Sequence, residues 1–305
     1  MNEFIYGIWE QALYDMSGEL LFQLNARGQG PGEYTDINAF AVNASLHQLV
    51  IYDNMKQSLM FYSTEDGRFV KSEKFNKPTP AEIAYWGGYF FYHNRLHRNY
   101  QDDVSLHYYL LASKDGITIG KRYFKHENNK EDYPFSPSGH NLYDNNSKLY
   151  YCRDFDNIVY QIHEDSVVPR FRINLPNPLP ASMIEERPNE MSLLRSGYSL
   201  GITDIYEYGG LLFFRFVKDG YIWSCLYNVE ESKQVYCAKR VKFLDSSLID
   251  TIDGIYKDCF YSILTPEYLD YAFSENPLED YPDLFKTYDV EGDNPVIAFY
   301  RAVVR

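Results

Sequence analysis

The sequence is short of basic residues and cysteines and has no long apolar run, and each shortage excludes a class of protein. Its 305 residues hold 29 Lys and Arg against 43 Asp and Glu, a formal net charge of -14. This negative excess repels phosphate backbones, so a nucleic-acid partner is not expected. No apolar stretch approaches the ~20 residues that a membrane helix needs, so no transmembrane segment is expected. The start, Met1–Phe4, has neither the basic nor the apolar region of an export signal.

The four cysteines do not form a metal or dithiol motif. Cys152, Cys225, Cys237 and Cys259 lack any C-x-x-C spacing, which argues against a zinc site. Cys225 and Cys237 flank a predicted turn centred on Glu231, so a hairpin could place them opposite each other. A cross-strand disulfide in an oxidising compartment and two small buried thiols both fit this arrangement, and the thiols are the favoured interpretation.

Aromatic residues, by contrast, are abundant and favour a β fold. They make up 17% of the chain, with 30 Tyr and 20 Phe, and both residue types suit half-buried pleated surfaces. The stretch Arg27–Tyr34 contains three glycines and a proline in eight residues, which excludes the interior of a helix or strand. It predicts a sharp turn between two strands.

An internal repeat indicates the architecture. Short polar turns with Gly between apolar runs recur at Gly18, Gly67 and Gly116, 49 residues apart, and a degenerate copy has Ser166 50 residues further on. Asp-Gly and Ser-Gly between apolar runs are typical of hairpins. A period of about 40–50 residues with several short strands predicts β-propeller blades. A β-sandwich with coincidental spacing is the alternative.

The repeat predicts an all-β fold, a six-bladed β-propeller with four-stranded antiparallel blades, as a single domain over residues 1–305. The first blade is expected to be incomplete, which predicts an N-terminally shortened chain. The remaining turn signals predict a short helix over Ala181–Arg187 and a further excursion containing Glu267–Phe273. The predicted blades span residues 1–27, 35–76, 80–125, 139–175, 201–243 and 247–305, with insertions at 176–200 and 266–293.

Two segments resemble a known family. Gly28–Tyr34 followed by a blade, and the ending Asn294–Tyr300, are similar to the signature of bacterial six-bladed propellers related to NHL-repeat proteins. That family is often described as envelope proteins or lipoproteins of unknown function. The resemblance covers nearly the whole chain and implies a periplasmic or cell-envelope location. It supplies no catalytic residues, and its usual secretion signal is not visible in this sequence.

Candidate binding residues follow from the Gly-rich stretch and the aromatic loops. The stretch lacks the Gly-Lys-Ser/Thr ending of a phosphate loop, so a structural turn is the favoured interpretation. Its polar residues could still point to a central pocket, and large side chains elsewhere could join them. The predicted binding residues are Arg27, Glu33, Tyr34, Trp86, Arg95 and Tyr206.

Two hypotheses for the function remain. The favoured one is a non-catalytic binding or scaffold module that recognises a small ligand, glycan, peptide or protein, with no cofactor and no catalytic residues. The alternative, which the resemblance suggests, is a Ca²⁺-dependent hydrolase or lactonase acting at a central channel. It would use the oxygen ligands Asp36, Asn38, Asn141 and Asp204, weak candidates because no spacing singles them out.

Overall fold

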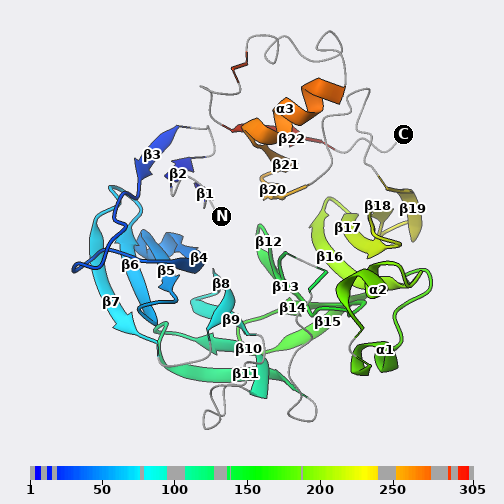
Figure 1. Ribbon diagram of the computed structural model, residues 1–305, viewed down its shortest axis with the longest axis horizontal. Helices are drawn as coiled ribbons and strands as arrows, with labels where there is room; N and C mark the ends of the chain where they lie inside the picture. The colour runs from blue at the N-terminus through cyan, green and yellow to red at the C-terminus, as the bar shows by residue number, and fades with distance from the viewer. Residues whose placement is uncertain are drawn as a thin grey trace. The chain divides into compact units, whose positions relative to one another are not determined.

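In the computed structural model, the secondary structure of the described residues is mainly antiparallel β-sheet, with a few short helices (Figure 1). It describes residues 4–7, 12–15, 19–75, 79–94, 107–126, 136–137, 139–186, 188–239, 252–275, 288–289 and 295–301. The chain divides into two units. Unit 1 comprises residues 1–142, 149–153 and 158–172, and unit 2 comprises residues 143–148, 154–157 and 173–305.

The described strands form sheets in which neighbours in the chain pair with each other. Four sheets have four strands. These are β4 (Ile37–Asn43), β5 (Gln48–Asp53), β6 (Ser58–Ser63) and β7 (Phe69–Lys74); β8 (Pro80–Trp86), β9 (Tyr89–Asn94), β10 (Tyr108–Ser113) and β11 (Ile119–Lys125); β12 (Leu142–Asn145), β13 (Lys148–Cys152), β14 (Ile158–Ile162) and β15 (Val167–Arg172); and β16 (Ser199–Tyr208), β17 (Leu211–Lys218), β18 (Tyr221–Asn228) and β19 (Lys233–Ala238).

Two further sheets have three strands each. The first contains β1 (Phe4–Gly7), β2 (Ala12–Asp15) and β3 (Leu20–Gln23), and the last contains β20 (Gly254–Tyr256), β21 (Cys259–Leu264) and β22 (Val296–Tyr300). The all-β propeller fold with four-stranded antiparallel blades is therefore confirmed. The predicted number of six four-stranded blades is not confirmed, because the first and last sheets lack a fourth strand among the described residues. The expected strand over 248–252 lies mostly outside them.

Packing between neighbouring sheets explains why the middle strands are apolar on both faces. In β5, Leu49 and Ile51 belong to a core shared with the first sheet, while Val50 and Tyr52 belong to a core shared with the next blade. All four side chains are fully buried. Burying one such side chain stabilises the fold by about 1.5–3 kcal/mol.

The described glycines of the repeat lie in hairpin turns with positive φ, as the sequence predicts. Gly67 has φ +68°, and a Cβ there would lie 2.6 Å from Cδ2 of Phe22 in the first sheet. Gly116 occupies the same hairpin of the next blade with φ +85°. Only glycine adopts such backbone angles at no steric cost, so the repeat spacing was set by the hairpins between third and fourth strands.

The two insertions carry helices. The first contains the predicted helix, α1 (Ala181–Glu185), and a second helix, α2 (Glu190–Leu194), that was not predicted. Asn189 caps α2 by accepting a hydrogen bond from Ser192 N at 2.9 Å. The second insertion contains α3 (Pro266–Glu275). No helix among the described residues is long and apolar enough to cross a membrane.

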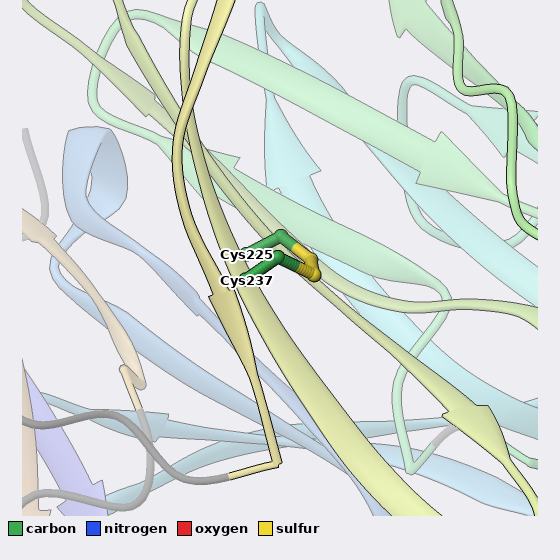
Figure 2. Close-up of a disulfide and its surroundings, with 2 residues drawn as sticks. All are labelled: Cys225 and Cys237. Atoms are coloured by element: carbon green, nitrogen blue, oxygen red, sulfur yellow. A yellow bond between two sulfur atoms is a disulfide. The ribbon is translucent and has the colours of Figure 1, made fainter.

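Cys225 and Cys237 form a disulfide between β18 and β19 (Figure 2). The two residues are direct partners in the antiparallel register, and their sulfur atoms are 2.01 Å apart. The hairpin geometry was predicted, but the favoured interpretation of two thiols was wrong, because sequence spacing gives the register and not the oxidation state. Cys152 and Cys259 are free cysteines.

Candidate functional site

The Gly-rich stretch in unit 1 is a loop closed by its own backbone and by one carboxylate. Gly28 N donates to Tyr34 O, and Tyr34 N donates to Ala26 O, both at 2.8 Å. The Glu33 carboxylate accepts from Gly30 N at 2.7 Å. A Cβ at Gly28 would lie only 2.1 Å from Oε2 of Glu33. The loop is a turn, as predicted, and Glu33 fills the space that its glycines leave.

Lys56 and the Tyr34 ring fix this loop to the neighbouring blade. Lys56 Nζ donates to Glu33 O at 2.5 Å and lies 3.3 Å from Gly30 O. The Tyr34 side chain is buried, and its hydroxyl donates to Leu24 O at 3.1 Å. Burial raises the pKa of this phenol, which the nearby Arg27 charge partly offsets. Tyr34 and Glu33 thus stabilise the turn, whereas Arg27 is exposed.

In unit 1, side chains on the first strand of one blade bond to the backbone near the first strand of the next. Asn38 on β4 donates to Pro80 O at 2.6 Å. The Glu82 carboxylate on β8 accepts from Asn141 N at 2.6 Å and from Leu142 N at 2.9 Å. The Asn141 amide also donates to Cys152 O at 2.9 Å. Two of the four weak metal-ligand candidates, Asn38 and Asn141, therefore link strands.

The same type of link occurs in unit 2. The Tyr143 hydroxyl on β12 donates to Thr203 O on β16 at 2.6 Å. Asn145 donates to Ile205 O at 3.3 Å and accepts from Glu207 N at 2.6 Å. Because the Asn145 amide nitrogen donates to β16 and its oxygen accepts from β16, these bonds fix the register of β12 against β16.

A buried ion pair lies beside these links. Arg215 on β17 donates through Nε to Asp204 on β16 at 2.7 Å, and the two side chains are 15% and 9% exposed. Burial disfavours the charged guanidinium, but the Asp204 carboxylate outweighs it and holds the pKa of Arg215 above its ordinary value. Asp204, the third metal-ligand candidate, is therefore neutralised by a cation of the same blade.

Two tyrosines and a second carboxylate surround the pair. The Tyr206 hydroxyl donates to Asp253 O at 2.9 Å, and Asp253 Oδ2 accepts from Ile263 N at 2.7 Å. Burial, reinforced by Asp204 and Asp253, raises the pKa of Tyr206 well above its ordinary range. Burial and Asp253 likewise raise the pKa of Tyr261. Both phenols stay protonated at neutral pH, and the Tyr206 hydroxyl acts as a hydrogen-bond donor.

We call Asp204, Tyr206, Arg215, Asp253 and Tyr261 the Asp204 cluster. Strongly perturbed pKa values from burial plus named charge partners are a physical mark of candidate functional sites. The cluster brings together Asp204 and Tyr206 from the sequence predictions. Asp253 and Tyr261 are the partly exposed members of the cluster, although the phenol ring of Tyr261 packs against Gly254.

The remaining predicted residues lie elsewhere. Trp86 ends β8 and packs, partly buried, against an aromatic core that includes Phe91 and Tyr151. Asp36 is exposed before β4. Arg95 lies outside the described residues. Within the described ranges, no group of three or more His, Cys, Asp or Glu side chains is arranged to hold a metal ion.

Sequence reasoning missed Arg215, Asp253 and Tyr261. A signal for Arg215 was present, because it interrupts the otherwise apolar run Leu211–Val217. A charge inside a buried strand needs a partner across the sheet, and the register pairs Arg215 with Asp204. Asp253 precedes a three-residue strand that the sequence does not reveal.

Comparisons with known proteins identify the fold. The profile of the family described as "Domain of unknown function (DUF4934)" matches residues 11–301. The chain is similar to a crystal structure of a Bacteroides fragilis protein provisionally described as exported, with 16% identity and a TM-score of 0.76 over 98% of this chain and 87% of that chain. At this identity, the likeness shows the fold alone.

Two more distant structures were found. A DUF4221 family member from Bacteroides vulgatus has 11% identity and a TM-score of 0.47, covering 74% of this chain and 73% of that chain. The WD40 β-propeller domain of Doa1 has 10% identity and a TM-score of 0.37, covering 84% of this chain and 66% of that chain. No curated protein matches the sequence.

Proposed function

The chain belongs to the DUF4934 family of unknown function, and from that premise we propose that it is a non-catalytic propeller that binds a ligand or partner in the bacterial cell envelope. The observation that supports binding over catalysis is that four of the five members of the Asp204 cluster already have a charged or hydrogen-bonding partner within the protein. Asp204 is neutralised by Arg215, Asp253 accepts from a backbone N–H, and Tyr206 donates to a carbonyl.

Groups held in this way resist proton transfer. A general base needs a lone pair directed at substrate and a pKa near the working pH. The tyrosines have raised pKa values, and the protonated hydroxyl of Tyr261 suits recognition by hydrogen bonding, whereas that of Tyr206 already donates to Asp253 O. We therefore assign the partly exposed side of the cluster, at Asp253 and Tyr261, as the candidate ligand contact. Arg27 and Trp86 remain predicted contacts in unit 1.

An envelope location has two supports. The Cys225–Cys237 disulfide suits an oxidising compartment, since such bonds persist outside the reducing cytosol. The similar Bacteroides fragilis structure is itself provisionally described as exported. Neither observation names the ligand.

The Ca²⁺-dependent hydrolase is not favoured. It requires oxygen ligands that are available to a cation, whereas the Asp204 carboxylate is paired with Arg215. Hard cations prefer several oxygen ligands around one position.

A thermal-shift screen of the whole chain tests the proposal. Small amines, oligosaccharides and peptides are screened together with Ca²⁺ and EDTA. A ligand at 100 times its Kd adds about 2.7 kcal/mol of apparent stability. We expect one organic class to raise Tm, and Asp253→Asn or Tyr261→Phe to abolish that rise. Tyr256→Phe, on the neighbouring strand, is the matched control. A rise with Ca²⁺ alone, followed by hydrolysis of a lactone or ester, would overturn the proposal.

A further inference from the structure

The Cys225–Cys237 disulfide ties the edge strand of its blade to the rest of the sheet (Figure 2). β19 is the last strand in the order β16-β17-β18-β19, so its outer side faces no further strand of this sheet. The side chains of β19 are exposed or half-buried, and none of them is fully buried. Burial of apolar side chains therefore does little to hold β19 against β18.

Other fourth strands are held at their ends by a backbone anchor. β7 and β15 also contain no fully buried side chain. In three blades, the residue directly after the fourth strand donates its N–H to the carbonyl of the residue directly before the third strand. These bonds run from Phe75 to Gln57, from His126 to His107 and from Ile173 to Asn157. Each bond closes the strand pair at the end away from its hairpin turn.

At the corresponding end of β19, the described residues provide a covalent tie. β19 pairs with β18 as far as Ala238, opposite Ser224, and Cys237 immediately precedes Ala238. Lys239, the last described residue here, adds a weaker tie, because its Nζ lies 3.5 Å from the centre of the Tyr221 ring. Tyr221 is 54% exposed, and a cation–π contact at an exposed site contributes little. The disulfide therefore occupies the place that a backbone anchor has in those three blades.

The two sulfur atoms of this disulfide differ in their accessibility. Cys225 on β18 is 3% exposed, whereas Cys237 on the edge strand is half-buried. A thiolate attacks one sulfur of a disulfide from the side opposite the other sulfur. For Cys237 this approach comes from the open side of β19. For Cys225 it comes from β17, where buried Phe214 is the direct partner of Cys225. Cys237 Sγ is therefore the sulfur open to attack, and Cys225 is the leaving group.

We propose that Cys225–Cys237 is a thiol–disulfide exchange site, which a dithiol reductant opens to release the end of β19. One thiolate of the reductant forms a bond to Cys237 Sγ as the Cys225–Cys237 bond breaks, and Cys225 leaves as a thiolate that takes a proton from water. The second thiolate of the reductant then attacks the mixed disulfide. The reductant becomes a disulfide, Cys237 leaves as a thiolate that is protonated in turn, and two electrons have passed to this chain.

A purely stabilising role explains the bond less well. A disulfide stabilises mainly by restricting the unfolded chain, and more so when it closes a long loop. Cys225 and Cys237 are only 12 residues apart, and the β18–β19 hairpin already places them opposite each other. The same hairpin keeps the two reduced thiols close, so oxidation can restore the bond. The oxidised form is the resting state in an oxidising compartment. The exchange is independent of any ligand bound at the Asp204 cluster.

Reduction of the folded whole chain by dithiothreitol, without denaturant, tests the proposal. Mass spectrometry after alkylation counts the new thiols, and hydrogen exchange follows the backbone amides. We expect the bond to open while the chain stays folded. The amides of β19 should then lose their protection, whereas those of β16 and β17 should keep theirs. A bond that opens only after unfolding in urea would overturn the proposal, as would reduction that leaves the exchange of β19 unchanged.

Two further measurements identify the attacked sulfur and separate this bond from the free cysteines. Glutathione, a monothiol, should be trapped by rapid alkylation as a mixed disulfide on Cys237, and trapping on Cys225 would contradict the proposal. Cys225→Ala with Cys237→Ala should show the exchange of the reduced parent chain with or without dithiothreitol, and full protection of β19 in this variant would also contradict it. Cys259→Ala, which removes a free cysteine, is the control and should behave like the parent chain.

Discussion

The hydroxyl of Tyr206 donates a hydrogen bond to the backbone carbonyl of Asp253 at 2.9 Å, joining β16 to the segment that begins the last sheet. Tyr206 was predicted as a ligand contact, and this bond gives it a structural part as well. The same side chain lies next to the Asp204 and Asp253 carboxylates, which, together with burial, raise its pKa. Tyr206 therefore has a structural role, because it joins β16 to the segment before β20.

Tyr206→Phe should destabilise the fold, because it removes the donor and leaves a carbonyl without its partner. A lost hydrogen bond of this kind costs about 0.5–1.5 kcal/mol. Urea unfolding measures the difference, with Tyr221→Phe as control, since that tyrosine is exposed on β18. Equal stability of the Tyr206 variant and the control would show that the bond contributes nothing.

The Asp204–Arg215 pair should behave as a buried ion pair. Arg215→Met leaves the Asp204 charge buried and should cost about 3–5 kcal/mol, whereas Asp204→Leu combined with Arg215→Met should recover most of that loss. Chemical denaturation of the two single variants and the double variant measures the coupling. Arg68→Met, which breaks the exposed pair with Asp66, should have no measurable effect. Additive single effects at Asp204 and Arg215 would contradict this interpretation.

Gly28→Ala should be destabilising because of one contact. The three atoms nearest to the new Cβ all belong to Glu33, so the carboxylate must leave Gly30 N, at a cost of about 1 kcal/mol. In a Glu33→Ala background the same substitution should cost little. Gly139→Ala is the control, since its Cβ would meet nothing within 4 Å. The difference in Tm between the two backgrounds is the measured quantity, and equal losses in both would place the cause elsewhere.

The sequence predicted the blades well because local chemistry defines them. Hairpin glycines such as Gly67 mark the turn between third and fourth strands, and alternating apolar residues such as Leu49 and Val50 serve two cores. It predicted the site poorly, because the partners of Asp204 and Tyr206 come from different strands. The α2 helix was missed because its start depends on a single cap, Asn189. The Cys225–Cys237 register was foreseen, and its oxidation was not.

Asp53 should make the free energy of unfolding depend on pH in the acid range. Its carboxylate accepts from Thr35 N at 2.6 Å, from the Thr35 hydroxyl and from Lys56 N at 2.9 Å. Burial alone would raise the pKa of this carboxyl, but these bonds outweigh it and hold the pKa below the ordinary 3.8. A carboxyl with a lowered pKa in the folded state adds stability above the unfolded pKa, and this stability is lost as the pH falls through the folded pKa.

Asp53→Asn should therefore lower stability at neutral pH, by about 1–3 kcal/mol for the bonds it weakens. Below about pH 4, the carboxyl of the parent chain begins to take up its proton. The difference in the free energy of unfolding between variant and parent, called the gap, should therefore narrow. Unfolding curves across this pH range measure the gap, and Asp36→Asn is the control, because that carboxylate is exposed just before β4. A gap that stays constant with pH would mean that Asp53 contributes through its shape and not through its charge. A gap that closes would make Asp53 the anchor that ties the Gly-rich loop to its blade near neutral pH.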